Sequence, residues 1–263
     1  MDWTRFRSVA VLATAVMLAA CAGTASPNPS TGAPAGSFVE ASAAPVASEN
    51  AAASAAAPAA SVDVSNAGQA LSNLTSYKVT ITTTTGTSTT FSAESVVIRK
   101  PTPASSFTET GGTSSFRVVT IGPDIWVDSG TGKYVKNPPG MSAATVAAMT
   151  NAFDPGTFLQ SLAKSFPIAA VPVQGIEQKN GVSAAHLHAD SSTALPAGSS
   201  PLPSGATVDV WIATDGNYLV ALEAKGLPAA ATPGASAATG ATSDFTIQVT
   251  NINDASLTVS PPA

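Results

Sequence analysis

The chain has 263 residues, with 11 lysine and arginine residues against 16 aspartate and glutamate residues, a formal net charge of −5 and an isoelectric point of about 4.8. An acidic chain gains nothing from neutralising phosphates, so the composition excludes nucleic acid as a partner and a polybasic patch as a membrane anchor. The single cysteine excludes a disulfide within the chain, so an exported domain must depend on its own hydrophobic core.

The first 20 residues have the three parts of a secretory signal. Arg5 and Arg7 supply a charged start, and residues 9–20 are apolar except Thr14. This run is too short to cross a bilayer, which takes about 20 apolar residues in a helix. It ends in Leu-Ala-Ala before Cys21, a string that resembles the lipobox of bacterial lipoproteins. The resemblance implies cleavage before Cys21, acylation of its sulfur, and anchoring to the extracytoplasmic side of the cell membrane. The alternative is an ordinary signal peptide followed by a chance cysteine.

Residues 21–63 are predicted to be a disordered tether that begins with the lipidated Cys21. They are mostly alanine, serine, proline and glycine, and Phe38 is the only aromatic residue among them. Such a stretch cannot bury enough surface to offset the entropy of ordering it. The tether therefore holds the domain clear of the membrane surface, unless it is a filler of no particular length.

The folded domain is predicted to span 64–263. It begins with a short helix after Ser65, because apolar residues then recur at helical spacing: Ala67, Ala70, Leu71 and Leu74. The period next changes to two, since Tyr77, Val79 and Ile81 alternate with polar residues, and this predicts a strand. Alternation between glycine and proline turns predicts an antiparallel meander of further strands at 91–99, 105–110, 115–121, 125–128 and 133–136.

The middle of the domain is predicted to form two helices, at 142–152 and 155–165. In the first, Val146, Met149 and Phe153 are spaced by three and four residues. Asp154 followed by Pro155 is typical of a helix start, with a capping side chain before a proline at the first helical position. The second helix carries a wide apolar stripe made of Phe158, Leu159, Leu162 and Phe166.

The last third returns to strands, predicted at 173–178, 182–189, 207–213 and 218–225, with a final alternating run from Phe245 to Val249. Asn180-Gly181 and Asp215-Gly216 are typical of hairpin turns. Two long segments rich in proline, serine, glycine and alanine, near 191–206 and 226–242, are predicted to be disordered insertions because they exceed normal connection lengths.

This order of elements resembles the LolA/LppX-like superfamily of bacterial lipoproteins and lipoprotein carriers, and most closely its LppX/LprG branch. The likeness covers roughly 64–263 and is carried by strand and turn patterns: Asn180-Gly181-Val182 leading into Ala185-His186-Leu187-His188, Val208 to Ile212 with Asp215-Gly216, and Ser243-Asp244-Phe245 through Val259 to Pro261-Pro262. The resemblance implies an α+β fold: a strongly curved antiparallel half-barrel sheet of about 10–11 strands, with helices over its concave face. It also implies an apolar cavity between sheet and helices that takes acyl chains.

The residues expected to line that cavity are the apolar side chains of the helical pair: Val146, Met149, Phe153, Phe158, Leu162 and Phe166. An apolar stripe at helical spacing usually packs a core, so a filled interior is the alternative reading of the same residues. If the interior is open, an acyl chain binds through burial of its methylene groups alone, without polar specificity.

His186, His188 and Asp190 are the strongest metal-site candidates, because alternate residues of a strand point to one face. The chain has no further histidine and no unmodified cysteine, which argues against a metal site here. A zinc site needs three or four ligands, and further residues that orient those ligands. We therefore expect a solvated polar strand face, with no metal and no cofactor.

No catalytic motif is found in the sequence. It has no Gly-x-Ser-x-Gly elbow and no phosphate-cradling loop. Three carboxylates lie near tryptophans, namely Asp124, Asp128 and Asp209, and these are expected at solvent-facing positions of hairpins. The sequence thus predicts a monomeric, non-enzymatic, membrane-anchored lipoprotein that binds or transfers a lipid or acyl ligand. The alternative is a cavity-less surface module that serves interaction or signalling.

Overall fold

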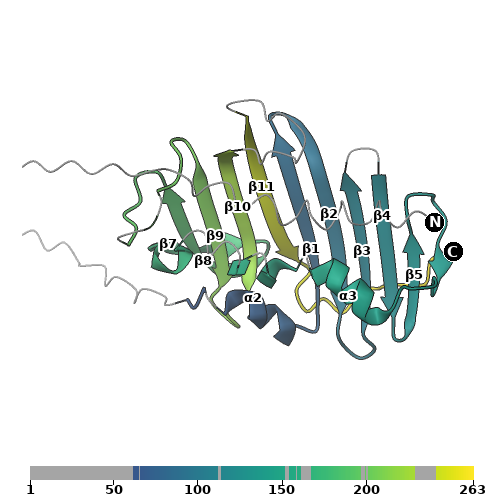
Figure 1. Ribbon diagram of the computed structural model, residues 1–263. Coiled ribbons are helices and arrows are strands. Elements are labelled where there is room, and N and C mark those ends of the chain that lie inside the picture. The colour runs from purple at the N-terminus through teal and green to yellow at the C-terminus, as the bar shows by residue number, and fades with distance from the viewer. Residues whose placement is uncertain are drawn as a thin grey trace, which may run out of the picture.

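The computed structural model describes residues 62–64, 66–111, 114–151, 154–157, 159–160, 167–196, 199, 201–228 and 241–263. They form one open antiparallel sheet of 11 strands in the order β6-β5-β4-β3-β2-β1-β11-β10-β9-β8-β7, with a few short helices on one side (Figure 1). The predicted fold class, an α+β half-barrel sheet that does not close, is confirmed. Among the described residues, no helix is long and apolar enough to span a bilayer.

Each predicted strand is present, and most differ from prediction by only a few residues. The strands are β1 (Ser76–Thr85), β2 (Ser88–Ile98), β3 (Ala104–Gly111), β4 (Ser114–Ile121), β5 (Asp124–Asp128), β6 (Val135–Lys136), β7 (Val173–Lys179), β8 (Val182–Asp190), β9 (Thr207–Ala213), β10 (Leu219–Pro228) and β11 (Thr242–Thr250). The chain after β11, residues 251–263, adds no further strand.

The inner face of the sheet, defined as the face that packs against the helices, is apolar. In β1 the inner residues Tyr77, Val79 and Ile81 are buried, while the polar residues between them are half-buried. The register pairs Val79 with Val249 of β11, so the inner faces of these strands coincide. Both belong to one buried cluster with residues of the helical segments, such as Ala67, Leu71, Val146, Leu159 and Ile168. The period-two pattern therefore does set one apolar face toward the helices.

The outer face is polar along β1 and β2, where Lys78 forms an ion pair with Glu94 at 2.7 Å. Near β8 to β10 it becomes partly apolar. Here Trp211 is buried with Ala184, Ala213 and Val220 in a second, smaller cluster. Parts of β8, β9 and β10 are thus buried on both faces.

The helices are shorter than predicted at the start of the domain. The expected helix after Ser65 divides into α2 (Ala67–Ala70) and the 3₁₀ turn η2 (Leu71–Asn73), while α3 (Ala143–Asn151) matches its prediction closely. Of the predicted helix at 155–165, residues 155–157 and 159–160 are described and are helical. A further 3₁₀ turn, η3 (Ile168–Ala170), precedes β7. In Figure 1, α2 and α3 lie in front of the lower part of the sheet.

The two predicted long insertions are only partly described. In the first, Leu195 and Leu202 pack against the main buried cluster. In the second, β10 continues to Pro228 and β11 begins at Thr242, and most of the residues between them lie outside the described part of the chain. The prediction that these segments are disordered therefore stays a prediction.

Candidate functional site

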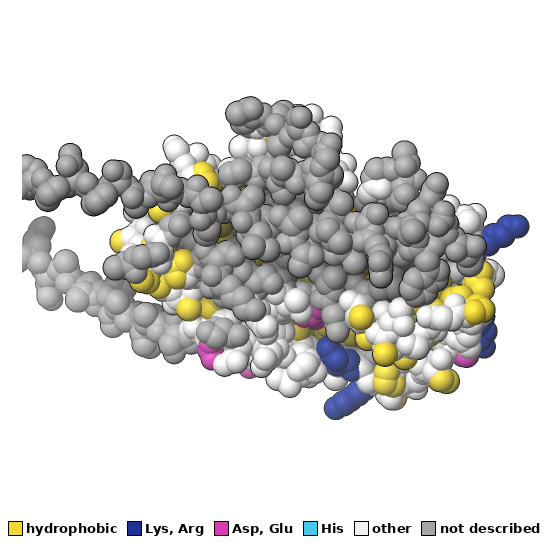
Figure 2. Space-filling view, viewed as in Figure 1, with side chains coloured by type: hydrophobic (Ala, Val, Ile, Leu, Met, Phe, Trp, Pro, Cys, Tyr) yellow, Lys and Arg dark blue, Asp and Glu magenta, His cyan; other side chains and the backbone are white. Residues whose placement is uncertain are grey.

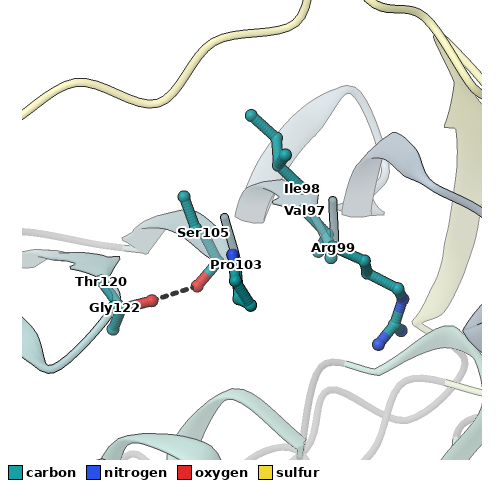
Figure 3. Close-up of a pocket in the computed structure, with 8 residues that line it drawn as sticks. Val97, Ile98, Arg99, Pro103, Ser105, Thr120 and Gly122 are labelled. Carbon is teal, nitrogen blue, oxygen red and sulfur yellow. Dashed lines mark hydrogen bonds between the residues drawn. The ribbon is translucent and has the colours of Figure 1, made fainter. Parts of the chain in front are cut away.

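An open pocket of about 380 Å³ lies on the inner face, at one end of β2, β3 and β4. It is lined by Val97, Ile98, Arg99, Pro103, Ala104, Ser105, Thr120 and Gly122. The strand register builds it, because Val97 lies opposite Ser105, and Ser105 opposite Thr120. Figure 3 shows these side chains around the open space. A volume of this size falls in the range of small-molecule sites, about 300–1,000 Å³.

The pocket combines an apolar wall with a small polar group. Val97 and Pro103 supply apolar surface. On the other side the hydroxyls of Ser105 and Thr120 hydrogen-bond to each other at 2.6 Å, the dashed line in Figure 3. Because one hydroxyl donates to the other, part of their hydrogen-bonding capacity is met within the pocket, which lowers the cost of an apolar ligand beside them.

One positive charge lies at the pocket. Arg99 follows directly after β2, and its backbone N–H donates to the carbonyl of Thr75 at 2.8 Å. Its guanidinium donates to the hydroxyl of Tyr77 at 3.3 Å and lies 5.8 Å from the centre of that ring. Burial raises the pKa of Tyr77, although the charge and the hydrogen bond of Arg99 act against this rise. A guanidinium has five donors, so Arg99 keeps capacity to bind an anionic group.

The interior beside this pocket is closely packed. The residues around Phe107 on the inner face, which include Val79, Ile81 and Ala93, leave no room for a water molecule. Next to them Glu109 lies opposite Ala93 and Phe116, and burial raises the pKa of its carboxyl. Among the described residues, the inner face around Phe107 is therefore filled, and the open pocket lies at the end of β2, β3 and β4.

The predicted cavity residues are placed only in part. Val146 is buried, with 4% of its surface exposed, and belongs to the main cluster. Met149 lies in α3, but its side chain is outside the described residues. Cys21 and the remaining cavity candidates, Phe153, Phe158, Leu162 and Phe166, also lie outside them. The roles of these residues stay predictions. The sequence analysis did not find the pocket, because neither Arg99 nor Ser105 belongs to a motif.

The histidine strand is arranged differently from the expected polar face. His186 and His188 lie on the outer face of β8, and both ring nitrogens that face β9 contact Asp209 Oδ1, at 2.9 Å and 2.6 Å. Asp190 does not join them. Its carboxylate accepts hydrogen bonds from Ser192, which lower its pKa, and from Thr193.

Two of the three carboxylates expected to face solvent do not do so. Asp128 is buried, with 1% of its surface exposed, because the following loop folds over it and donates hydrogen bonds to Oδ1. The side chain of Asp209 is only 15% exposed, since the two histidines flank it. Asp124 alone is substantially exposed, and it forms an ion pair with Lys136 at 2.9 Å.

Comparison with known proteins gives only distant likenesses. No protein-family model and no curated protein matches this sequence. Among solved structures, MucB in complex with MucA(peri) is 12% identical with a TM-score of 0.33, and the match covers 76% of this chain and 57% of that chain. The Pseudomonas aeruginosa MucA/MucB complex is 13% identical with a TM-score of 0.32, and the match covers 70% of this chain and 56% of that chain.

A LolA superfamily protein, NE2245 from Nitrosomonas europaea, gives 10% identity, a TM-score of 0.24, and coverage of 78% of this chain and 96% of that chain. This chain thus spans little more than half the length of the MucB chains that it matches. TM-scores below 0.5 do not establish a common fold, so a function must be argued from the residues of this chain.

Proposed function

We propose that this protein is an exported lipoprotein that binds or transfers a ligand bearing an acyl chain. The acyl chain enters the pocket beside Val97. The observation that carries the proposal is the continuity of an apolar inner face with an open pocket at its end. The signal sequence and Cys21 support an anchor on the extracytoplasmic side of the cell membrane, which keeps the pocket within reach of lipids.

The pocket can supply useful affinity without catalytic groups. Each buried methylene contributes about 0.8 kcal/mol, so six of them contribute about 5 kcal/mol. Part of this is lost to the entropy of association. Binding is reversible, because the acyl chain moves between two apolar environments, the membrane and the pocket, and no covalent bond forms.

Arg99 indicates the chemistry of the other end of the ligand. Arg99 lines the pocket, and a guanidinium suits a carboxylate or phosphate oxygen, which it can bind through two donors. Figure 2 shows lysine and arginine side chains beside hydrophobic ones at the α3 and β5 end of this face. The ligand that fits best is therefore an anionic amphiphile.

The pocket is tested by titrating the delipidated protein with a fluorescent fatty acid. We expect saturable binding of one probe per chain. Val97→Phe, which fills the pocket, should weaken it at least about tenfold, which is 1.4 kcal/mol. Val96→Phe is the matched control, because Val96 precedes Val97 in β2 and lies on the opposite face. Equal effects of the two variants, or no saturable binding, would contradict the proposal.

The headgroup is tested with Arg99→Gln. We expect the affinity for the fatty acid to fall about tenfold, and the affinity for an uncharged alcohol of the same chain length to stay unchanged. Lys100→Gln is the control, since Lys100 is exposed and does not line the pocket. A similar loss in both variants would show a general effect of charge and would remove Arg99 from the site.

A second candidate function is a surface interaction module with no lipid cavity. The close packing around Phe107 favours it, because there the inner face has no room for a ligand. This function predicts that no acyl probe binds saturably.

A further inference from the structure

The outer face of the sheet carries a group of imidazole and carboxylate side chains, far in sequence from the pocket. His186 and His188 belong to β8, and Asp209 belongs to β9, where the register places it directly opposite His188. Asp209 Oδ1 lies 2.9 Å from His186 Nε2 and 2.6 Å from His188 Nδ1. One ligand atom from each of the three residues can be chosen so that all lie within 4.8 Å of one another.

We propose that His186, His188 and Asp209 bind a divalent transition-metal ion of the Zn²⁺ type. Two imidazoles and one carboxylate are donors that such ions prefer, and Mg²⁺ or Ca²⁺ do not favour imidazole. The ligand atoms would be His186 Nε2, His188 Nδ1 and an oxygen of Asp209. In a tetrahedral zinc site, donor atoms lie about 3.3–3.5 Å apart. The distances from Asp209 Oδ1 to His186 Nε2 and His188 Nδ1 therefore need to lengthen by about 0.4–0.9 Å to admit the ion.

The side of His186 that faces away from Asp209 lies near the carboxylate of Glu177 and against the indole of Trp211. While Nε2 faces Asp209, Nδ1 lies 3.7 Å from Glu177 Oε1 on β7. Glu177 is itself held, because the indole N–H of Trp211 donates to the same oxygen. The ring of Trp211 also stacks on His186, with 4.5 Å between ring centres and 9° between planes. At 3.7 Å the contact of Nδ1 with Glu177 is longer than a hydrogen bond, so the ring of His186 is oriented chiefly by the stacked indole, with the carboxylate nearby.

The neighbouring lysines do not cancel the negative charge of the site. Lys179 lies 3.7 Å from the centre of the Trp211 ring, and its ammonium is paired with Glu223 at 2.8 Å. Lys225 also pairs with Glu223, at 3.3 Å. Asp209 is flanked by the two histidines, whose side chains are 21% and 34% exposed, so an ion from solution can reach them.

The structure distinguishes this site from the one suggested by the sequence. The alternating string of His186, His188 and Asp190 offers Asp190 as the third ligand, but the residue that clusters with the histidines is Asp209, and Oδ1 of Asp190 accepts hydrogen bonds from Ser192 instead. Asp209 comes from the next strand in the sheet, 19 positions after Asp190 in the numbering. Asp190→Asn and Asp209→Asn are therefore a matched pair, with the same chemical change at two carboxylates near the same histidines.

The experiment is a titration with Co²⁺ of full-length protein that carries no histidine tag, purified in detergent and freed of metal. We expect one Co²⁺ per chain, the intense visible absorption of a tetrahedral site, and displacement by Zn²⁺ but not by Mg²⁺. Asp209→Asn should weaken binding by at least about 100-fold, and Asp190→Asn should leave it unchanged. Should Asp209→Asn fail to fold, as judged by circular dichroism, His188→Gln provides the same test.

Glu177→Gln tests whether the carboxylate beside His186 supports the bound ion. We expect Co²⁺ to bind about tenfold more weakly, with an unchanged absorption spectrum. A rise in melting temperature with Zn²⁺, present in the wild type and absent in Asp209→Asn, would support the site independently. The proposal is overturned if Co²⁺ does not bind stoichiometrically, if Asp209→Asn binds like the wild type, or if Asp190→Asn alone abolishes binding. None of these outcomes depends on whether an acyl chain binds at Val97.

Discussion

At the scale of single residues, Asp128 is a buried carboxylate satisfied by the loop that follows it. Oδ1 accepts hydrogen bonds from the backbone N–H groups of Gly130, Thr131 and Gly132, at 3.0, 2.8 and 3.1 Å. Burial alone acts to raise the pKa of Asp128, but these backbone hydrogen bonds and the Thr131 hydroxyl outweigh it and hold the pKa below its ordinary value. The ionised carboxylate therefore stabilises the folded chain.

A lowered pKa makes this stabilisation depend on pH. It is fully present above the ordinary aspartate pKa of about 3.9 and is lost as the pH falls through the lower value of the folded state. We expect Asp128→Asn to be less stable than the wild type in urea at pH 7, with the difference shrinking as the pH falls below about 4. Asp215→Asn, on an exposed turn, is the control. A difference that does not change with pH would contradict this role of the charge.

The sequence predicts contacts between residues of one strand, but not contacts between strands. The spacing of His186, His188 and Asp190 correctly placed all three on one strand, but the residue that joins the histidines is Asp209, which only the pairing of β8 with β9 brings near. The burial of Asp128 did have a local signal, since the Ser-Gly-Thr-Gly string after it favours a loop that folds back on an acidic side chain.

At the scale of elements, α2 packs very closely against the helical turn at 155–157. A Cβ built on Gly68 would lie 2.2 Å from the Cα of Gly156, and both residues are buried. Two backbones can approach this closely only without side chains. Gly68 is therefore required by packing, even though alanine is the better helix former by about 1 kcal/mol.

We expect Gly68→Ala to destabilise the protein by about 1–3 kcal/mol, because the added methyl group must push α2 off its neighbour. Gly175→Ala is the matched control: nothing lies within 4 Å of its Cβ position. The measurement is the urea midpoint of each variant. If both variants unfold at the same urea concentration as the wild type, α2 does not pack as described.

Strands with one apolar face, such as β1, were predictable because apolar and polar residues alternate along them. Tyr77, Val79 and Ile81 alone locate β1 and its inner face. The helix at the start of the domain was harder to predict. The apolar spacing near Leu71 does not show that α2 ends there and a 3₁₀ turn begins. The pocket at Val97 had no local signal either, because it arises from register across three strands.

At the scale of the whole molecule, the sheet joins the two ends of the domain. β1 and β11 pair in the middle of the sheet, from Lys78 opposite Thr250 to Thr85 opposite Ser243. The last residue of the tether proposed at 21–63, Asp63, contacts the turn between β9 and β10, where it and Asn217 exchange hydrogen bonds of 2.9 and 2.7 Å. These hydrogen bonds hold the start of the folded domain against the sheet.

The proposed anchor gives a prediction at the same scale. In a bacterial host we expect the mature wild type to enter the detergent phase on Triton X-114 partitioning and to carry acyl groups on Cys21 by mass spectrometry. Cys21→Ser should move to the aqueous phase, and Ser26→Ala, in the same segment, should behave as the wild type. A wild-type chain without lipid, or a Cys21→Ser chain still in the detergent phase, would contradict the anchor.

The most direct test of the central claim is mass spectrometry of the lipids that remain bound to the purified protein. The account predicts a near-stoichiometric anionic acyl ligand on the wild type and on Val96→Phe, and a strong depletion of that ligand on Val97→Phe. Wild-type protein that carries no acyl ligand, or an equal amount on both variants, would contradict binding at this pocket.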